Sequence, residues 1–270
     1  MDLGLKGRAC VVTGASRGIG AETARLLCAE GASVLLVARN EERLNLATDA
    51  ARSAGADGGG RAEMLALDIT GEDAGELMLS TAEDHFGALD VLVNNAGSAQ
   101  WRHLDDIPDK DWYAQYELNV MAPLRTMRAA APAMAERGWG RIVNVCSTAG
   151  KRPSAAMPEY SVAKAAELSL SRLFADRYAK SGVLVNAICP GPVESEMWME
   201  PGGLLDQSHA MSGAASREEA LATAGSKRPI GRLAKSGEIA SAIVFLCSER
   251  ASYVAGAAWS VDGGTVQVII

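Results

Sequence analysis

Seven short apolar runs recur along the chain, and helical patterns fill most of the intervals between them. Valine, isoleucine and leucine follow one another in these runs, which is typical of parallel strands covered on both faces. The runs span residues 8–14, 32–39, 62–68, 89–97, 140–147, 183–191 and 257–264. Helices are expected near residues 18–30, 41–54, 71–86, 109–137, 158–181 and 236–248. This alternation predicts an α/β fold: a doubly wound parallel seven-stranded sheet with helices on both faces.

The pattern is that of a single domain. The chain has 270 residues, of which 48% are apolar, and can bury one large core. The glycine-rich stretch at residues 55–60 is too short for a linker between domains, and the sequence holds no internal repeat. We therefore assign residues 1–270 to one domain.

Residues 192–230 break the regular alternation. Apolar side chains, among them Met197, Trp198 and Leu204, are mixed there with proline, glycine and serine. This composition predicts a variable, mobile segment that covers the substrate. Met197 and Trp198 fit two interpretations at this point: internal packing of the segment, or contact with an apolar substrate.

Charge and hydropathy exclude several classes of partner. The formal net charge is −7 and no basic run occurs, which argues against a surface that binds nucleic acid or an anionic membrane. The sequence has no apolar stretch of about 18 residues, and it begins without the charged leader and long apolar region of an export signal. We expect a cytoplasmic protein that acts on small molecules.

The cysteines and histidines do not form a metal-binding pattern. The five cysteines, at positions 10, 28, 146, 189 and 247, are scattered, and no C-x-x-C pair occurs. Four of them lie in apolar runs, which indicates buried free thiols in a reducing cytosol. The three histidines are far apart in the sequence, so no metal site is expected.

A glycine-rich turn follows the first strand. Gly14, Gly18 and Gly20 lie between that strand and the first helix, with the spacing G-x-x-x-G-x-G. Glycines allow a tight turn and a close approach of the backbone to a pyrophosphate, and the helix N-terminus offers unpaired N–H groups. The turn indicates a dinucleotide site, although a structural turn without a ligand remains an alternative.

The end of the second strand bears on the choice of dinucleotide. An acidic residue there would bind the ribose 2′-hydroxyl of NAD, whereas an arginine accommodates a 2′-phosphate. The strand ends in Ala38 and Arg39, and Arg17 in the glycine turn can reach the same phosphate. The sequence therefore favours NADP(H), with NAD(H) possible. Alternatively, Arg39 pairs at the surface with Glu41 or Glu42.

Tyr160 and Lys164 form an i, i+4 pair in the predicted helix at residues 158–181. Such residues share one helix face at about 5–6 Å between Cβ atoms. The ammonium favours the phenolate and lowers the pKa of the phenol, which makes tyrosine a usable acid or base. Alone, the pair is also compatible with chance.

These residues belong to an ordered set of motifs that resembles the short-chain dehydrogenase/reductase family, nearest to its 3-oxoacyl-carrier-protein reductase-like members. The resemblance covers about residues 5–265. It is carried by TGASRGIG at 13–20, Asp68, NNAG at 94–97, Asn119, Ser147, YSVAK at 160–164, PGPVES at 190–195 and VDGG at 261–264. It implies a Rossmann-like fold and hydride transfer between NADP(H) and a carbonyl or secondary alcohol.

The resemblance implies cofactor contacts along the whole cleft. Asp68 and the Ile69 backbone would bind the adenine, Asn94 would brace the sheet, and Val193 and Ser195 would hold the nicotinamide carboxamide. The full cofactor set implied is Gly14, Ser16, Arg17, Gly18, Ile19, Gly20, Arg39, Asp68, Ile69, Asn95, Ala96, Gly97, Tyr160, Lys164, Pro190, Gly191, Val193 and Ser195. Asp68 also fits an N-cap of the following helix.

The resemblance also implies a catalytic tetrad. Tyr160 would donate the proton, while Lys164 would stabilise the phenolate and bind the nicotinamide ribose. Ser147 would hydrogen-bond the substrate oxygen, and Asn119 would hold a water that connects Lys164 to solvent. Taken singly, Ser147 fits a turn residue and Asn119 a buried residue at a helix kink. Cys146 is expected in the core.

Three further functions remain open: an NAD-dependent alcohol dehydrogenase working oxidatively, a non-catalytic dinucleotide-binding sensor, and an oligomerisation module without cofactor.

Family members commonly form homotetramers or homodimers through helices that here span about 110–137 and 158–181. We expect the apolar tail at 266–270 to be buried at a subunit contact. In the loop at 98–108, Trp101 and Arg102 are candidates for substrate contact, or Arg102 pairs with Asp105 or Asp106.

Overall fold

A seven-stranded parallel sheet forms the centre of the molecule in this computed structural model, which describes residues 1–212 and 214–267, without the side chains of 211 and 212. The strand order is β3-β2-β1-β4-β5-β6-β9, and every neighbouring pair is parallel. The strands are β1 (Ala9–Thr13), β2 (Ser33–Ala38), β3 (Arg61–Ala66), β4 (Val91–Asn94), β5 (Gly140–Val145), β6 (Val183–Pro190) and β9 (Ala258–Val261).

Successive side chains of a strand enter two different cores, because they point to opposite faces of the sheet. In β1, Cys10 and Val12 pack into one apolar cluster and Val11 into the other. In β2, Val34 and Leu35 divide between the clusters in the same way. Since both faces are covered, both sets of positions are apolar, and this explains why the strands read as unbroken apolar runs.

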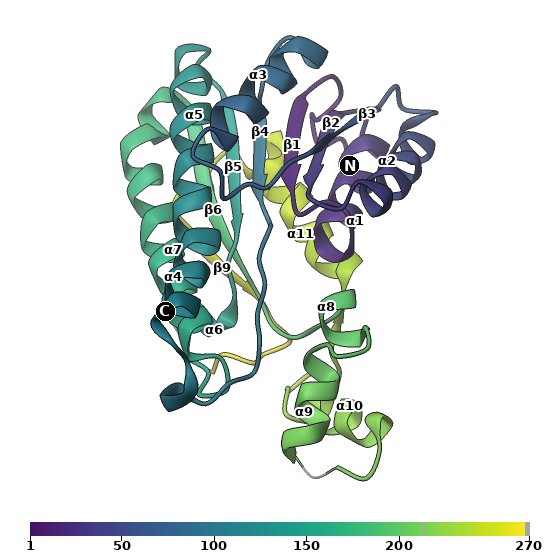
Figure 1. Ribbon diagram of the computed structural model, residues 1–270. Helices are drawn as coiled ribbons and strands as arrows, with labels where there is room; N and C mark the ends of the chain where they lie inside the picture. The colour runs from purple at the N-terminus through teal and green to yellow at the C-terminus, as the bar shows by residue number, and fades with distance from the viewer. Residues whose placement is uncertain (213, 268–270) are drawn as a thin grey trace.

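Helices cover both faces, as Figure 1 shows, with α1, α2 and α11 on one face and α3, α5 and α7 on the other. The helices are α1 (Gly18–Ala29), α2 (Glu41–Gly55), α3 (Ala74–Phe86), α4 (Asp109–Tyr116), α5 (Ala122–Glu136), α6 (Thr148–Lys151), α7 (Pro158–Tyr178) and α11 (Ser236–Cys247). Short 3-10 segments are η1 (Leu104–Asp106), η3 (Ala179–Ser181) and η4 (Glu249–Ala251). The predicted doubly wound fold is confirmed.

The helix predicted at residues 109–137 runs without a gap from Asp109 to Glu136, but it is not α-helical throughout. A π-helical segment, η2 (Glu117–Met121), separates α4 from α5, and Asn119 lies at its centre, fully buried. A π-turn adds a residue to the helical repeat and re-aims the side chains beside it. Asn119 is therefore buried within the helix, as one of its two interpretations requires.

Residues 192–230 are more regular than their composition predicts. They contain α8 (Glu196–Met199), α9 (Leu204–Ser212) and α10 (Arg217–Ser226), and β7 (Val193–Glu194) pairs with β8 (Ala234–Lys235). The three helices extend away from the sheet at the lower end of the molecule in Figure 1. Trp198, Leu204 and Ala220 form an apolar cluster of their own, so the segment has a small core.

The remaining expectations concern the thiols and the tail. The five cysteines are free and buried, as expected. Within the described ranges, no helix has both the length and the apolar character required to cross a bilayer. Of the tail predicted to be buried at a subunit contact, residues 268–270 lie outside the described residues.

Candidate active site

A cleft of about 1590 Å³ opens at the carboxyl ends of the strands. β1 and β4 are neighbours in the sheet but are not consecutive in the chain, and ligands of α/β sheets bind at such a switch point. The cleft is lined by Gly14, Ser16, Arg17, Gly18, Ile19, Arg39, Asp68, Ile69, Asn95, Ala96, Gly97, Ser147, Tyr160, Lys164, Pro190, Gly191, Val193 and Ser195. Of the residues that the sequence assigns to the site, Gly20 and Asn119 are buried behind this lining.

The glycine turn is packed too closely for side chains. Gly14 has a φ of +63°, and a Cβ there would lie 2.7 Å from the Cα of Ala96. A Cβ on Gly20 would lie 2.4 Å from the carbonyl oxygen of Gly14. Because neither glycine has a side chain, the backbone of the turn can lie this close to its neighbours and directly at the cleft surface.

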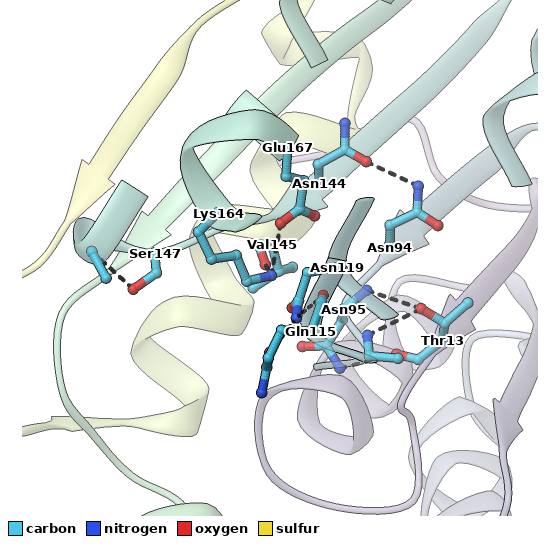
Figure 2. Close-up of polar contacts among 12 residues, drawn as sticks. Thr13, Asn94, Asn95, Gln115, Asn119, Asn144, Val145, Ser147, Lys164 and Glu167 are labelled. Carbon is cyan, nitrogen blue, oxygen red and sulfur yellow. Dashed lines mark hydrogen bonds and ion pairs between the residues drawn. The ribbon is translucent and has the colours of Figure 1, made fainter. Parts of the chain in front are cut away.

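Asn95 and Thr13 lock this turn to the end of β4 (Figure 2). The Asn95 side-chain amide donates to the carbonyl oxygens of Thr13 and Gly14, at 2.9 and 3.2 Å. In return, the Thr13 hydroxyl accepts the backbone N–H groups of Asn95 and Ala96, at 3.0 and 3.1 Å. Asn95 therefore acts on the cofactor cleft by shaping the turn.

The N-terminus of α1 suits an anion. Its N-cap residue, Arg17, makes no side-chain capping bond, so the first N–H groups of the helix face the glycine turn without a side-chain acceptor. A helix N-terminus in this position attracts phosphate through its N–H groups and its dipole. Together with the turn that only glycine can form, this end of the cleft fits the pyrophosphate of a dinucleotide.

Three arginines gather around the end of the cleft beside β2. Arg39 is 78% exposed and lies 3.7 Å from Asp68, so the pairing with Glu41 or Glu42 that the sequence left open is wrong. Arg17 and Arg43 both pair with Glu200, which follows α8; the Arg43 contact is 2.9 Å. All three arginines line the cleft, and the carboxylate of Glu200, from the 192–230 segment, balances part of the charge of Arg17 and Arg43.

Asp68 is not a helix cap. Its carboxylate accepts hydrogen bonds from the backbone N–H and the hydroxyl of Thr70, at 3.0 and 2.8 Å, and the N-cap of α3 is Asp73. These two bonds, with a further contribution from Arg39, lower the pKa of Asp68. An ionised acceptor is thus fixed at the cleft wall.

Ser147, Tyr160 and Lys164 meet where β5 ends and α7 begins. Pro158 occupies the first turn of α7, where a missing N–H is tolerated, and this fixes where Tyr160 enters the cleft. The Lys164 ammonium lies 5.7 Å from the centre of the Tyr160 ring. Lys164 and a hydrogen bond with Ser147 act to lower the pKa of the Tyr160 phenol, as predicted, but burial outweighs them and the net shift of this pKa is upward.

Lys164 is buried and tightly held. Its Nζ donates to the carbonyl oxygen of Val145 at 3.0 Å and to the carboxylate of Glu167 at 2.7 Å (Figure 2). Burial lowers the pKa of the ammonium, but the Glu167 carboxylate and the Tyr160 phenol outweigh this effect, and the net shift is upward. Lys164 therefore carries its charge throughout the neutral range.

Asn119 faces the same place from the other side. Its Nδ2 donates to the backbone carbonyl and to the side chain of Gln115, at 3.0 and 2.8 Å, while its buried Oδ1 has no partner within the described residues. A Cβ on Gly97 would lie 3.3 Å from this Oδ1 and 3.8 Å from Lys164 Nζ. The free acceptor and the ammonium thus converge on one point, which suits a bridging water or hydroxyl.

Beneath the site, Asn94 braces the sheet, as the resemblance implies. Its Nδ2 donates to Asn144 Oδ1 at 2.9 Å, and its Oδ1 accepts from the Thr126 hydroxyl at 2.8 Å. These bonds connect β4, β5 and α5, and they lie fully inside the protein. The brace holds β4 and β5 in register below the catalytic residues.

The loop at 98–108 joins the site to the 192–230 segment. The Trp101 backbone N–H donates to the Gln207 side chain of α9 at 2.8 Å, and Trp101 packs on the apolar cluster of that segment. Arg102 pairs with Asp111, so the predicted pairing with Asp105 or Asp106 is wrong. Trp198 belongs to the cluster and also borders the cleft, so both interpretations of Met197 and Trp198 retain support.

A Rossmann-type fold with a phosphate cradle and a Ser–Tyr–Lys group defines an oxidoreductase that uses a nicotinamide dinucleotide. The family model described as short chain dehydrogenase matches residues 8–202, and the chain belongs to this family.

Several relatives are similar over the full length. The chain is 38% identical over 262 residues to the cis-4-hydroxycyclohexanecarboxylate dehydrogenase of Sinomonas cyclohexanicum, covering 97% of each protein. It is 34% identical to a 3-oxoacyl-[acyl-carrier-protein] reductase of Vibrio cholerae, covering 98% of this chain and 100% of the relative. The structure of the L-sorbose reductase of Gluconobacter frateurii with NADPH and L-sorbose matches with a TM-score of 0.90 at 33% identity, with both chains fully covered.

Sequence reasoning missed several residues that shape the site. Arg43 and Glu200 are ordinary surface residue types, and only the fold places them together. Gln115 precedes Asn119 by one helical turn, a spacing that could have pointed to it. Glu167 follows Lys164 by three residues, so the sequence held a signal for this pair as well.

Proposed function

We propose that the protein is an NADP(H)-dependent reductase of a carbonyl compound, which also oxidises the corresponding secondary alcohol. The observation that carries this proposal is the meeting of Ser147, Tyr160 and Lys164 in one cleft, beside the glycine turn. The named activities of the relatives, one a dehydrogenase and two reductases, support the same reaction class.

The roles of the side chains follow from the charge that the reaction develops. Bound NADP(H) supplies or accepts the hydride. Hydride addition leaves negative charge on the substrate oxygen, which the Ser147 hydroxyl stabilises by a hydrogen bond. Tyr160 Oη donates its proton to that oxygen, and the Lys164 ammonium stabilises the phenolate that remains. The free Asn119 Oδ1 holds the bridging water or hydroxyl through which Lys164 receives a new proton from solvent.

The preference for NADP(H) rests on Arg17 and Arg39. Both line the cleft, and β2 does not end in an acidic residue that could bind a 2′-hydroxyl. Arg43 adds a third positive group, and Glu200 now occupies a position between Arg17 and Arg43. A 2′-phosphate would compete with that carboxylate for the same two guanidinium groups.

Arg17→Ala and Arg39→Ala are each expected to weaken NADPH binding about tenfold or more, because each removes a charge-assisted bond to phosphate. NADH affinity should stay within about twofold. Fluorescence titration of both dinucleotides measures this. Arg52→Ala is the matched control, since Arg52 on α2 pairs with Asp49 of the same helix and with Glu63 of β3. Equal loss of affinity for both dinucleotides would contradict the 2′-phosphate assignment.

A panel of ketones and keto acids, assayed with NADPH and NADH separately, tests the proposed function. Turnover with NADPH supports it. Turnover with NADH alone, or with alcohols and NAD⁺ alone, would favour the NAD-dependent dehydrogenase. Tight binding of a dinucleotide without turnover of either substrate class would favour the sensor, and failure to bind either dinucleotide would favour the oligomerisation module.

We further propose that residues 192–230 cover the substrate. Trp198, Leu204 and Ala224 border the cleft while they pack against one another. Trp198→Ala is therefore expected to raise KM for an apolar carbonyl about tenfold, with NADPH affinity unchanged. Trp259→Ala, on the outer strand β9, is the matched control and should change neither value. A Trp198 variant with wild-type KM would refute the contact.

A cytoplasmic location and a homotetramer or homodimer complete the proposal. The free, buried cysteines suit a reducing compartment. Val162 and Leu173 on α7 are 55% and 66% exposed, which supports association through this helix.

A further inference from the structure

Glu167 is a buried carboxylate that the proposed reaction does not use. It lies one turn after Lys164 on α7, and both side chains are almost fully buried, at 2% and 3% exposure. Their atoms Oε2 and Nζ are 2.7 Å apart (Figure 2). A charge buried this deeply is stable only when paired, so the two residues form one unit.

The contacts of the buried pair determine how many N–H groups of Lys164 remain available to the cleft. An ammonium has three N–H groups. One donates to the carbonyl oxygen of Val145 and one to Glu167, both on the interior side. One N–H group therefore remains for the cleft, where Asn119 Oδ1 and the Gly97 backbone lie.

Few other titratable groups face this unit. Cys146, at the end of β5, hydrogen-bonds Glu167, and burial raises the pKa of its thiol far above the ordinary value, so it stays neutral. Cys189 on β6 lies beyond it and is also neutral, because burial raises its pKa to about 11. From the helices packed on α7, Asp111 and Glu117 are already paired with Arg102 and Arg125.

We propose that Glu167 is a positioning residue: its carboxylate orients Lys164 and cancels part of the ammonium charge, so that Tyr160 remains a protonated donor over the neutral range. The inference rests on the proposed function, since it concerns the acid of that reaction. The proposal implies a direction of reaction: in the resting protein, Tyr160 already holds the proton that carbonyl reduction requires.

The direction in which Glu167 shifts the Tyr160 pKa follows from the charges of the three groups. An isolated ammonium beside a phenol stabilises the phenolate and lowers the phenol pKa. A carboxylate behind that ammonium opposes this effect, and Glu167 does act to raise the Tyr160 pKa. Removing the carboxylate charge should therefore release Tyr160 to ionise at lower pH. It should also lower the pKa of Lys164, because the largest effect that opposes its burial is then lost.

Glu167→Gln tests this, since glutamine keeps the shape and one acceptor but removes the charge. The first readout needs neither substrate nor cofactor: an ultraviolet titration of tyrosinate, taken as the difference between each protein and its Tyr160→Phe derivative. The midpoint should fall by about one pH unit or more in Glu167→Gln. Asp176→Asn, which removes the acid of an exposed ion pair on the same helix, should leave it unchanged.

The second readout is the pH profile of turnover. The acidic limb of alcohol oxidation and the alkaline limb of carbonyl reduction should both move to lower pH in Glu167→Gln, by the same amount as the titration. A purely structural role would lower the rates without moving either limb, and that result would overturn the inference.

If Glu167→Gln does not fold, the wild-type titration still tests the premise that Tyr160 keeps its proton over the neutral range. A Tyr160 midpoint near neutrality overturns the inference, and one at or above the ordinary phenol value of about 10 supports that premise, to which burial of the phenol also contributes. The proposed function fails separately. If no carbonyl or alcohol turns over while the titration midpoint still moves, the reaction assignment is wrong and the charge coupling stands.

Discussion

Tyr160→Phe is expected to lower carbonyl turnover by a factor of about 10² to 10⁴, because it removes the general acid and leaves the ring in place. Tyr160 is the phenol that Lys164 approaches, and its other neighbour is the Ser147 hydroxyl. NADPH affinity should change little, since the glycine turn and the arginines remain. Steady-state kinetics and fluorescence titration of NADPH measure the two quantities.

Tyr113→Phe is the matched control, because Tyr113 on α4 is 74% exposed and outside the cleft lining. It should retain wild-type turnover. If Tyr160→Phe retained more than about a tenth of the wild-type rate, another group would have to supply the proton, and the proposed mechanism would be wrong.

Lys164→Met is expected to remove turnover and also to destabilise the fold by about 3–5 kcal/mol, because it leaves Glu167 buried without a partner of opposite charge. The double variant Lys164→Met/Glu167→Leu removes both charges, so it should recover most of that stability while staying inactive. Denaturant unfolding of the three proteins measures the free energy of unfolding. A double variant no more stable than Lys164→Met would contradict the pairing.

The loss of stability in Lys164→Met should depend on pH. Burial raises the folded-state pKa of Glu167 above its unfolded value of 4.5, and without Lys164 only the hydrogen bond from Cys146 opposes this effect. A group with a raised folded-state pKa contributes its stability below the unfolded value and loses it as the pH rises through the folded value. The difference in stability between the single and double variants should therefore be smallest below pH 4.5 and largest at neutral pH.

Much of the fold could be predicted from the sequence because its signals are local. The unbroken apolar runs mark buried parallel strands, and all seven lie in the sheet. Predictions failed where long-range packing decides. The helix at 109–137 contains the π-segment η2, and the 192–230 segment forms three helices around Trp198 although proline, glycine and serine interrupt its pattern.

The residues of the candidate site also divide into those that local sequence signals identify and those whose partners depend on long-range packing. Gly14, Tyr160 and Lys164 could be identified because their spacing reflects the turn and the helix that carry them, whereas Ser147 followed from the resemblance to the family. The partners of Arg39, Arg102 and Asp68 could not, because exposed side chains choose among several nearby charges.

By itself, the sequence determined the doubly wound sheet and the glycine turn and pointed to the side chains proposed to react, since each depends on residues close together in the chain. Only the tertiary structure decided how their charges are balanced. Glu200 reaches Arg17 from a distant segment, and the burial of Glu167 beside Lys164 depends on how α7 packs against β5 and β6. Burial is a property of the whole fold, and burial is what gives the carboxylate of Glu167 its influence on the proton of Tyr160.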